Sequence, residues 1–174
     1  MMFSVSGDGR LSLAGRDVRC ALGRAGVRNA AGKREGDGAT PAGLWPLRRL
    51  LWRPDRLAAP SSRLPRAAIG PDDGWCDAPR DRAYNRPVRL PYPASAERMW
   101  REDGVYDVVV VLGYNDAPVV PGAGSAIFMH VARPDYAATE GCIALALEDL
   151  VELVSRAAPG DAVRVAALDQ RDEW

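Results

Sequence analysis

The chain contains one histidine, His130, and it is followed by Cys142 within the stretch SAIFMHVARPDYAATEGCIAL, which runs from Ser125 to Leu145. A cysteine attacks carbonyl carbons as its thiolate, so a nucleophilic thiol needs a base or a cation close by. His130 is the one imidazole that the chain offers for this role near neutral pH. The pair therefore indicates a Cys–His site for acyl transfer.

The residues around this pair favour a chemical role. The apolar residues 126–129 predict a buried strand that would hold His130 rigidly. Gly141 allows positive φ or a close approach to a substrate, and the amides of Gly141 and Cys142 could donate to a developing oxyanion. Taken singly, a free cysteine is more often a small buried apolar residue, and a lone histidine a hydrogen-bonded core residue. The combination, with the polar pair 139–140 directly before Gly141, favours catalysis.

The same stretch resembles a known family. An apolar strand that ends in His130, followed by a loop and Thr-x-Gly-Cys-hydrophobic at 139–143, is similar to the L,D-transpeptidase catalytic domain, also called the YkuD domain. Residues 33–43, KREGDGATPAG, resemble the K-x-x-G-D-G-x-T-P-x-G segment of that family. Three further motifs resemble one branch of it: WCD at 75–77, YNR at 84–86 and YN at 114–115. The resemblance covers about residues 23–165, and the two main motifs in this order are more specific than Gly-Cys alone.

Two positions depart from the pattern of the family. Glu140 stands before the Gly-Cys pair where many members carry histidine, and Ala144 stands where many carry arginine or asparagine. The interval between histidine and cysteine is also shorter than is usual. These changes leave the nucleophile and the base in place. They bear on how an acyl donor is held and on whether an amine or water accepts the acyl group.

The resemblance implies an enzyme that transfers acyl groups of peptidoglycan stem peptides. Cys142 would attack the donor to form a thioester, His130 would be the base, and an amine of a second stem peptide would complete a cross-link. With water as the acceptor, the enzyme would be an L,D-carboxypeptidase or another cysteine amidohydrolase. The family also implies a backbone carbonyl or a Ser/Thr as the partner of the second ring nitrogen of His130. Ala138 and Thr139, just before the nucleophile, are best placed in the sequence for this. We expect a carbonyl there rather than the carboxylate of Asp135, because a carbonyl orients the ring without holding it as imidazolium.

Two other classes of protein remain as alternatives. In papain-like peptidases the cysteine usually precedes the histidine, whereas here it follows. A non-catalytic cell-wall-binding module would have no need to keep His130 and the Gly141–Cys142 pair.

Composition limits the partners and cofactors. A chain of 174 residues, of which 47% are hydrophobic, suits a single domain over residues 1–174. The formal net charge is zero, so nothing indicates a nucleic-acid-binding surface. One histidine and three cysteines without a C-x-x-C pair do not form a zinc motif, and we expect neither a metal nor another cofactor. The sequence allows a disulfide between Cys20 and Cys76 but gives no positive support for it.

Targeting signals are equally sparse. The first residues, MMFSVSGDGR, lack a charged region followed by an apolar one, so no signal peptide is expected in this sequence. The longest apolar run, 108–112, is too short to span a membrane. The resemblance implies the cell envelope or periplasm, and the missing signal leaves the cytoplasm as the alternative. We expect a monomer.

The pattern of apolar residues predicts a mostly β fold: two packed sheets of mixed strands, in a sandwich or partial barrel, with one or two helices. We expect strands at 10–13, 17–21, 43–52, 105–112, 125–131 and 161–166. The valine-rich run 105–112 is typical of a strand buried on both faces. Helical spacing predicts a helix over 147–158 and a shorter one over 94–101. The last residues form a polar tail.

An irregular segment, residues 53–95, interrupts this pattern and is called the excursion below. Its aromatic residues argue for an ordered segment that walls the active site. The predicted substrate-binding residues in the excursion are Asp77, Tyr84, Asn85 and Arg86, although ordinary loop roles are as plausible for each of them. Thr139 and Arg133 complete the predicted substrate-binding set.

Overall fold

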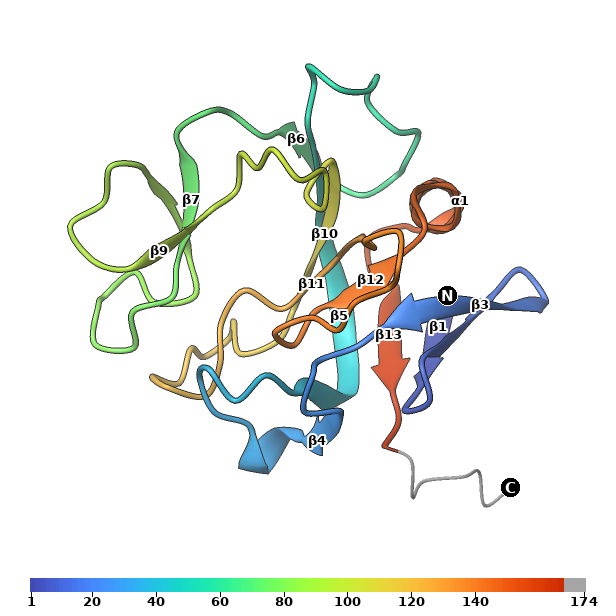
Figure 1. Cartoon of the computed structure of the whole chain (residues 1–174), viewed down its shortest axis with the longest axis horizontal. Helices are drawn as coiled ribbons and strands as arrows, with labels where there is room; N and C mark the ends of the chain where they lie inside the picture. The colour runs from blue at the N-terminus through green and yellow to red at the C-terminus, as the bar shows by residue number, and fades with distance from the viewer. Residues whose placement is uncertain (168–174) are drawn as a thin grey trace.

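The computed structural model describes residues 1–167, and within them the chain is mostly β with one α-helix (Figure 1). The first part contains β1 (Met2–Ser6), β2 (Arg10–Leu13), β3 (Arg16–Ala21), β4 (Val27–Asn29), the short 3-10 helix η1 (Ala30–Gly32) and β5 (Thr40–Trp52). The middle part contains β6 (Arg66–Ala68), β7 (Asp73–Cys76), β8 (Pro87–Arg89) and β9 (Ala96–Arg98). The last part contains β10 (Val108–Leu112), β11 (Phe128–Val131), β12 (Ile143–Leu145), α1 (Leu147–Arg156) and β13 (Ala162–Val165). The predicted polar tail falls on residues 168–174, outside the described part.

The main sheet closes into a barrel. Its strands follow the order β10–β11–β12–β3–β2–β1–β13–β5, and β5 pairs with β10 as well. Strand β5 is long enough to pair with β13 through residues 43–46 and with β10 through residues 47–52. The pairs β1–β13 and β11–β12 are parallel, whereas the hairpin strands β1, β2 and β3 pair antiparallel. The predicted mostly β fold with mixed strands and a partial barrel is therefore confirmed.

Strand β10 separates two hydrophobic cores, and all of its residues are buried, as its run of valines predicts. Val108, Val110 and Leu112 belong to one core, and Val109 and Val111 belong to the other. The first core is shared with the strands of the barrel and with α1. The second is shared with the excursion through Trp75 and with the predicted nucleophile, Cys142. The candidate site therefore lies on the side of the barrel that the excursion covers.

The two helix predictions had different outcomes. Helix α1 is confirmed, with Glu148 and Asp149 in its first turn. The prediction of a helix over 94–101 is wrong, because its middle forms β9, which pairs antiparallel with β7. An isolated helix of that length is marginally stable, so pairing with a neighbouring strand decides the conformation.

The excursion is ordered around β7 and β8, which form a small sheet with β9, the strand that directly follows the excursion. Figure 1 shows β7 and β9 to one side of the barrel. Asn85 anchors it to the barrel, because its side-chain amide donates to the carbonyls of Tyr114 and Asn115 at 3.1 and 2.8 Å. The side-chain oxygen of Asn85 accepts from the indole of Trp75 at 2.9 Å and from the amide of Ala126 at 3.0 Å. These contacts hold the excursion against the segment that leads to His130.

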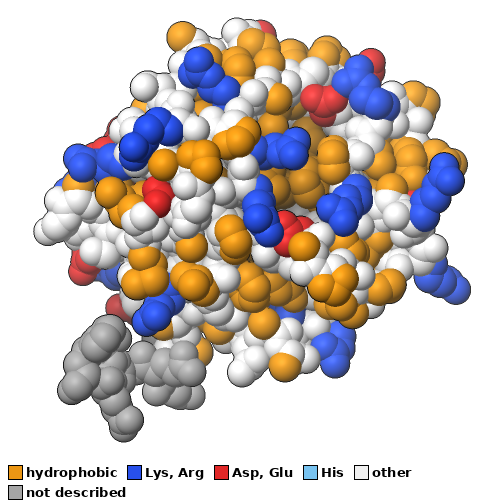
Figure 2. Space-filling view, turned by 180° about the vertical axis from the view of Figure 1, so that it is seen from behind, with side chains coloured by type: hydrophobic (Ala, Val, Ile, Leu, Met, Phe, Trp, Pro, Cys, Tyr) orange, Lys and Arg blue, Asp and Glu red, His pale blue; other side chains and the backbone are white. Residues whose placement is uncertain are grey.

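The surface and the thiols complete the description of the fold. Cys20, Cys76 and Cys142 are all free and buried, so the Cys20–Cys76 disulfide that the sequence left open is not formed. No helix within residues 1–167 has the length and apolar character needed to cross a membrane. On the face shown in Figure 2, basic side chains are interspersed with apolar and acidic ones.

Replacement of Asn85 tests the anchoring of the excursion. Asn85→Ala leaves the groups that it binds without partners in a buried place, so we expect the free energy of unfolding to fall by about 2–4 kcal/mol in urea denaturation. Arg86→Ala is the matched control: Arg86 is exposed and donates one hydrogen bond, to the carbonyl of Asp116, so its loss should cost under about 1 kcal/mol. Equal effects of the two substitutions would contradict the anchoring role.

Candidate active site

Cys142 and His130 lie on the wall of one cavity of about 570 Å³. His130 is in β11, where residue 130 pairs with Ala144 of the parallel strand β12, and Cys142 directly precedes β12. Parallel pairing thus brings the two predicted reacting residues to the same region of the barrel. Both residues are largely buried, at 8% and 7% exposure, so both functional groups are largely shielded from bulk water.

The thiol of Cys142 is hydrogen-bonded to the backbone of the segment that leads into β11 and His130. Its Sγ donates to the carbonyl of Ala126 at 3.2 Å and accepts from the amide of Phe128 at 3.4 Å. Burial raises the pKa of the thiol to about 12, and the negative charge of Glu97 adds to the rise. In the structure as it stands, Cys142 is therefore a protonated thiol.

His130 is neutral for the same reason. Burial lowers the pKa of its imidazole to about 4. Its Nδ1 lies 2.9 Å from the carbonyl of Val131, and as the donor in this bond it leaves the lone pair on Nε2. The expected backbone carbonyl is present, but it is that of Val131 and not of Ala138 or Thr139, because the ring folds back onto its own strand. The carboxylate of Asp135 accepts instead from the amide of Ala137 at 2.9 Å.

The hydroxyl of Thr139 braces the loop that carries the nucleophile. It donates to the carbonyl of Cys142 at 2.7 Å and accepts from the amide of Gly141 at 3.1 Å. The amide of Gly141 is therefore occupied, which corrects its prediction as an oxyanion donor and leaves the amide of Cys142 as the remaining candidate. Thr139 lines the cavity, but its hydroxyl is used by the backbone and is not directed to a substrate.

Gly141 is required for a close approach of two backbone segments. Its φ is +134°, a value that residues with a side chain rarely adopt. A Cβ at this position would lie 2.8 Å from the carbonyl oxygen of Ala39. The loop before β5 therefore packs directly on the residue that precedes the nucleophile.

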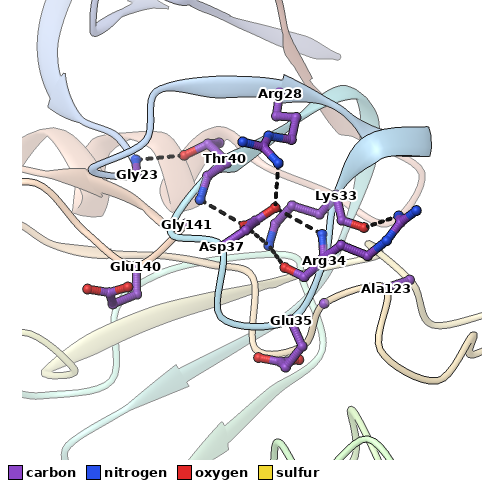
Figure 3. A network of polar contacts seen from close by, with 12 residues as sticks. Gly23, Arg28, Lys33, Arg34, Glu35, Asp37, Thr40, Ala123, Glu140 and Gly141 are labelled. Atoms are coloured by element: carbon purple, nitrogen blue, oxygen red, sulfur yellow. Dashed lines mark hydrogen bonds and ion pairs between the residues drawn. The ribbon is translucent and has the colours of Figure 1, made fainter.

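A buried ion pair shapes that loop, as Figure 3 shows. The ammonium of Lys33, the one lysine of the chain, donates to Asp37 at 2.7 Å and to the carbonyl of Arg34 at 2.9 Å. Asp37 also accepts from the amide of Ala39 at 3.0 Å, which orients the residue that contacts Gly141. The KREGDGATPAG motif thus supports the nucleophile, and Lys33 adds a positive charge to the cavity wall.

The remaining cavity wall contains both expected and unexpected residues. Asp77 and Arg133 line the cavity as predicted. Glu97, Arg101 and Tyr106 also line it, and the sequence analysis missed all three. The hydroxyl of Tyr106 donates to Glu97 at 2.6 Å, and its ring meets that of His130 edge-on, at 5.4 Å between centroids. Glu97 and Arg101 lie within the segment 94–101, for which the sequence predicts a helix, so the sequence gives no sign that they line the cavity.

Three predicted substrate contacts do not line the cavity. Tyr84 and Asn85 are buried, and Arg86 points to the backbone of the loop at Asp116, so none of the three lines the cavity. The hydroxyl of Tyr84 donates to Glu35 and accepts from the amide of Gly124 at 2.9 Å. Buried polar groups need hydrogen-bond partners. The polar side chains of Tyr84, Asn85 and Arg86 thus hold the excursion against the rest of the protein rather than a ligand in the cavity.

This chain is similar to known proteins in sequence and in structure. A family model described as the L,D-transpeptidase catalytic domain, YkuD, matches residues 2–165. An L,D-transpeptidase from Mycobacterium smegmatis is similar in structure at 13% identity and a TM-score of 0.47, over 95% of this chain and 58% of that one. L,D-transpeptidase 3 from Mycobacterium tuberculosis, in complex with a faropenem-derived adduct, is similar at 14% identity and a TM-score of 0.45, over 94% of this chain and 59% of that one. The chain thus spans little more than half of either protein, and no curated protein matches it.

The ionisation of Cys142 can be tested by alkylation. In a Cys20→Ala/Cys76→Ala protein, we expect the rate of Cys142 alkylation by iodoacetamide to keep rising with pH beyond about 9, because the thiol ionises only near pH 12. The same protein unfolded in urea should show the ordinary midpoint of about 8.5. A plateau at or below that midpoint in the folded protein would contradict a neutral resting pair.

Substitution of Gly141 tests the contact with Ala39. Gly141→Ala should lower the free energy of unfolding by at least about 2 kcal/mol, because it adds a clash to an unfavourable φ. Gly122 has a φ of +77° and open space around it, so Gly122→Ala should lose only about 1 kcal/mol. If urea denaturation gives the same loss for both, the contact with Ala39 does not restrict position 141.

Proposed function

Because the chain belongs to the L,D-transpeptidase catalytic domain family, we propose that it transfers acyl groups of peptidoglycan stem peptides through Cys142 and His130. The observation that carries the proposal is the location of this thiol and this neutral imidazole on the wall of one cavity. A neutral imidazole with a free lone pair is the form that can take a proton. The cavity has the volume of a site for a small peptide.

The first half of the reaction forms a thioester. As Sγ of Cys142 attacks the carbonyl carbon of the diamino acid that precedes a terminal D-alanine, Nε2 of His130 takes the thiol proton. The amide of Cys142 donates to the resulting oxyanion. When the tetrahedral intermediate collapses, the C–N bond breaks, and His130 returns the proton to the leaving amine of D-alanine.

The second half transfers the acyl group to an amine. The amine nitrogen of a second stem peptide attacks the thioester carbon, His130 takes the proton that the nitrogen loses, and the C–S bond breaks. The proton then returns to the sulfur of Cys142, so the enzyme is regenerated and a cross-link is formed. Water in place of the amine would give hydrolysis, which is a carboxypeptidase reaction.

The charged groups of the cavity suit a donor with carboxylates and an amine. Arg101 and Arg133 both contact Asp103 and lie on the cavity wall, where a guanidinium can bind a peptide carboxylate. Oδ1 of Asp77 is buried and has no hydrogen-bond partner within residues 1–167. We propose that it accepts a hydrogen bond from the free amino group of the donor. The cell envelope is the proposed place of action.

Mass spectrometry of purified muropeptides tests the function. Incubation with the protein should give cross-linked products, and Cys142→Ala should lower the rate by at least about 10³-fold, because the nucleophile is removed. Cys20→Ala and Cys76→Ala are matched controls, since both thiols are buried and outside the cavity, and both should stay active. Trimmed peptides without cross-links would indicate a carboxypeptidase, and unchanged peptides would refute the proposal.

A further inference from the structure

A second cavity, of about 480 Å³, lies beside the first. It is formed by the turn between β1 and β2, the end of β3, the segment 22–26 and the loop around Tyr136. Ala138 lines both cavities, so the second one reaches the loop that precedes the nucleophile. We call this second cavity the arginine groove.

The arginine groove is positively charged. Its lining contains the guanidinium groups of Arg10, Arg19 and Arg24, and Asp8 is its one acidic residue. Arg24 pairs with Glu140 at 3.0 Å, whereas Arg10 and Arg19 have no carboxylate partner within residues 1–167. The groove therefore holds two guanidinium groups whose charge no carboxylate of the described chain neutralises.

Arg10 and Arg19 are paired across the β2–β3 hairpin. They lie directly opposite each other in the antiparallel pair β2–β3, on its exposed face. Like charges that face each other across a pair of strands destabilise it. An anion bound between them would remove that repulsion and gain two charge-assisted hydrogen bonds.

Arg19 is also held in place by the loop before the nucleophile. Its guanidinium lies 4.3 Å from the centre of the ring of Tyr136. Tyr136 has a φ of +55°, which is unusual for a bulky residue and is found where the surrounding structure requires it. One terminal nitrogen of the guanidinium also donates to the carbonyl of Asp135 at 3.5 Å. Stacking on an aromatic ring orders a guanidinium, and its other N–H groups can still bind a carboxylate.

The groove is continuous with the nucleophile loop through Arg24. The amide of Arg24 donates to the carbonyl of Thr139 at 2.8 Å, and its side chain binds both carboxylate oxygens of Glu140. A ligand in the groove would therefore lie next to the residues that lead to Cys142.

We propose that the arginine groove binds the carboxylate-bearing part of the acyl acceptor, an inference that rests on the proposed function. A cross-linking reaction must bring two peptides to one thioester, and the donor occupies the cavity that contains Cys142. The acceptor needs a separate surface from which its amine reaches the acyl carbon. Stem peptides carry several carboxylates, which match the unpaired Arg10 and Arg19.

Direct binding tests the groove without turnover. Cys142→Ala protein is titrated with a stem tetrapeptide while backbone amide shifts are followed by nuclear magnetic resonance. We expect shifts at residues 7–10, 19–24 and 136–138. The Cys142→Ala protein that also carries Arg10→Ala and Arg19→Ala should bind the peptide about tenfold more weakly. A peptide with amidated carboxylates should bind to the Cys142→Ala protein about tenfold more weakly as well. Arg164→Ala, an exposed strand arginine opposite Ser4 and Leu44, is the control and should change nothing.

Kinetic measurements on protein that retains Cys142 distinguish this inference from the proposed function. Thioester formation with the donor alone should be equal in the wild type and in Arg10→Ala/Arg19→Ala, while the KM for the acceptor rises about tenfold. No thioester in the wild type would refute the proposed function. Thioester formation with no groove shifts, or with shifts that the double variant retains, would overturn the arginine groove alone.

Discussion

Burial of the Cys142 thiol and the His130 imidazole is the constraint on which the rest of the site depends. Because both groups are largely shielded from water, they are stable in their neutral forms. In the proposed reaction, proton transfer between them creates two charges there, so that reaction depends on groups that favour the charged pair once a substrate is present. The positive charges of Lys33 and Arg101 favour the thiolate, and the negative charge of Glu97 opposes it. Arg101 also lowers the pKa of His130 and so opposes the imidazolium. In the proposed reaction, the net effect of these charges would therefore shift the barrier to attack.

The burial of β10 on both faces contributes to the burial of Cys142. Strand β10 supports a second core on its outer side, and Cys142 belongs to that core. The excursion closes that core through Trp75, and Asn85 holds the excursion to the barrel. On the other side of the nucleophile, Lys33 and Asp37 hold the loop that packs on Gly141. The nucleophile is thus positioned from two directions by segments far from it in sequence.

The sequence predicted those features whose cause is local. The run of valines in β10 and the helical spacing of apolar residues in α1 can both be recognised within a short stretch of sequence. Because the chain has one histidine, the sequence also identifies the imidazole of the site. The prediction of a helix over 94–101 is wrong because the local sequence pattern does not show that this segment pairs with β7. The sequence predicts a substrate contact at Asn85 because a polar residue in a loop gives no sign of the distant groups that will bind it. The local pattern does not predict that Glu97 lines the cavity, because Glu97 lies in β9, which pairs with the distant strand β7.

Glu140 illustrates how structure changes the meaning of a departure from a family pattern. A carboxylate beside the nucleophile would raise the pKa of the thiol if it pointed inward. In the structure its side chain is 75% exposed and paired with Arg24, so water and an ion pair screen its charge from Cys142. The same ion pair links the nucleophile loop to the arginine groove. Glu140 therefore lines the cavity that contains Cys142 without having a direct part in the proposed proton transfer.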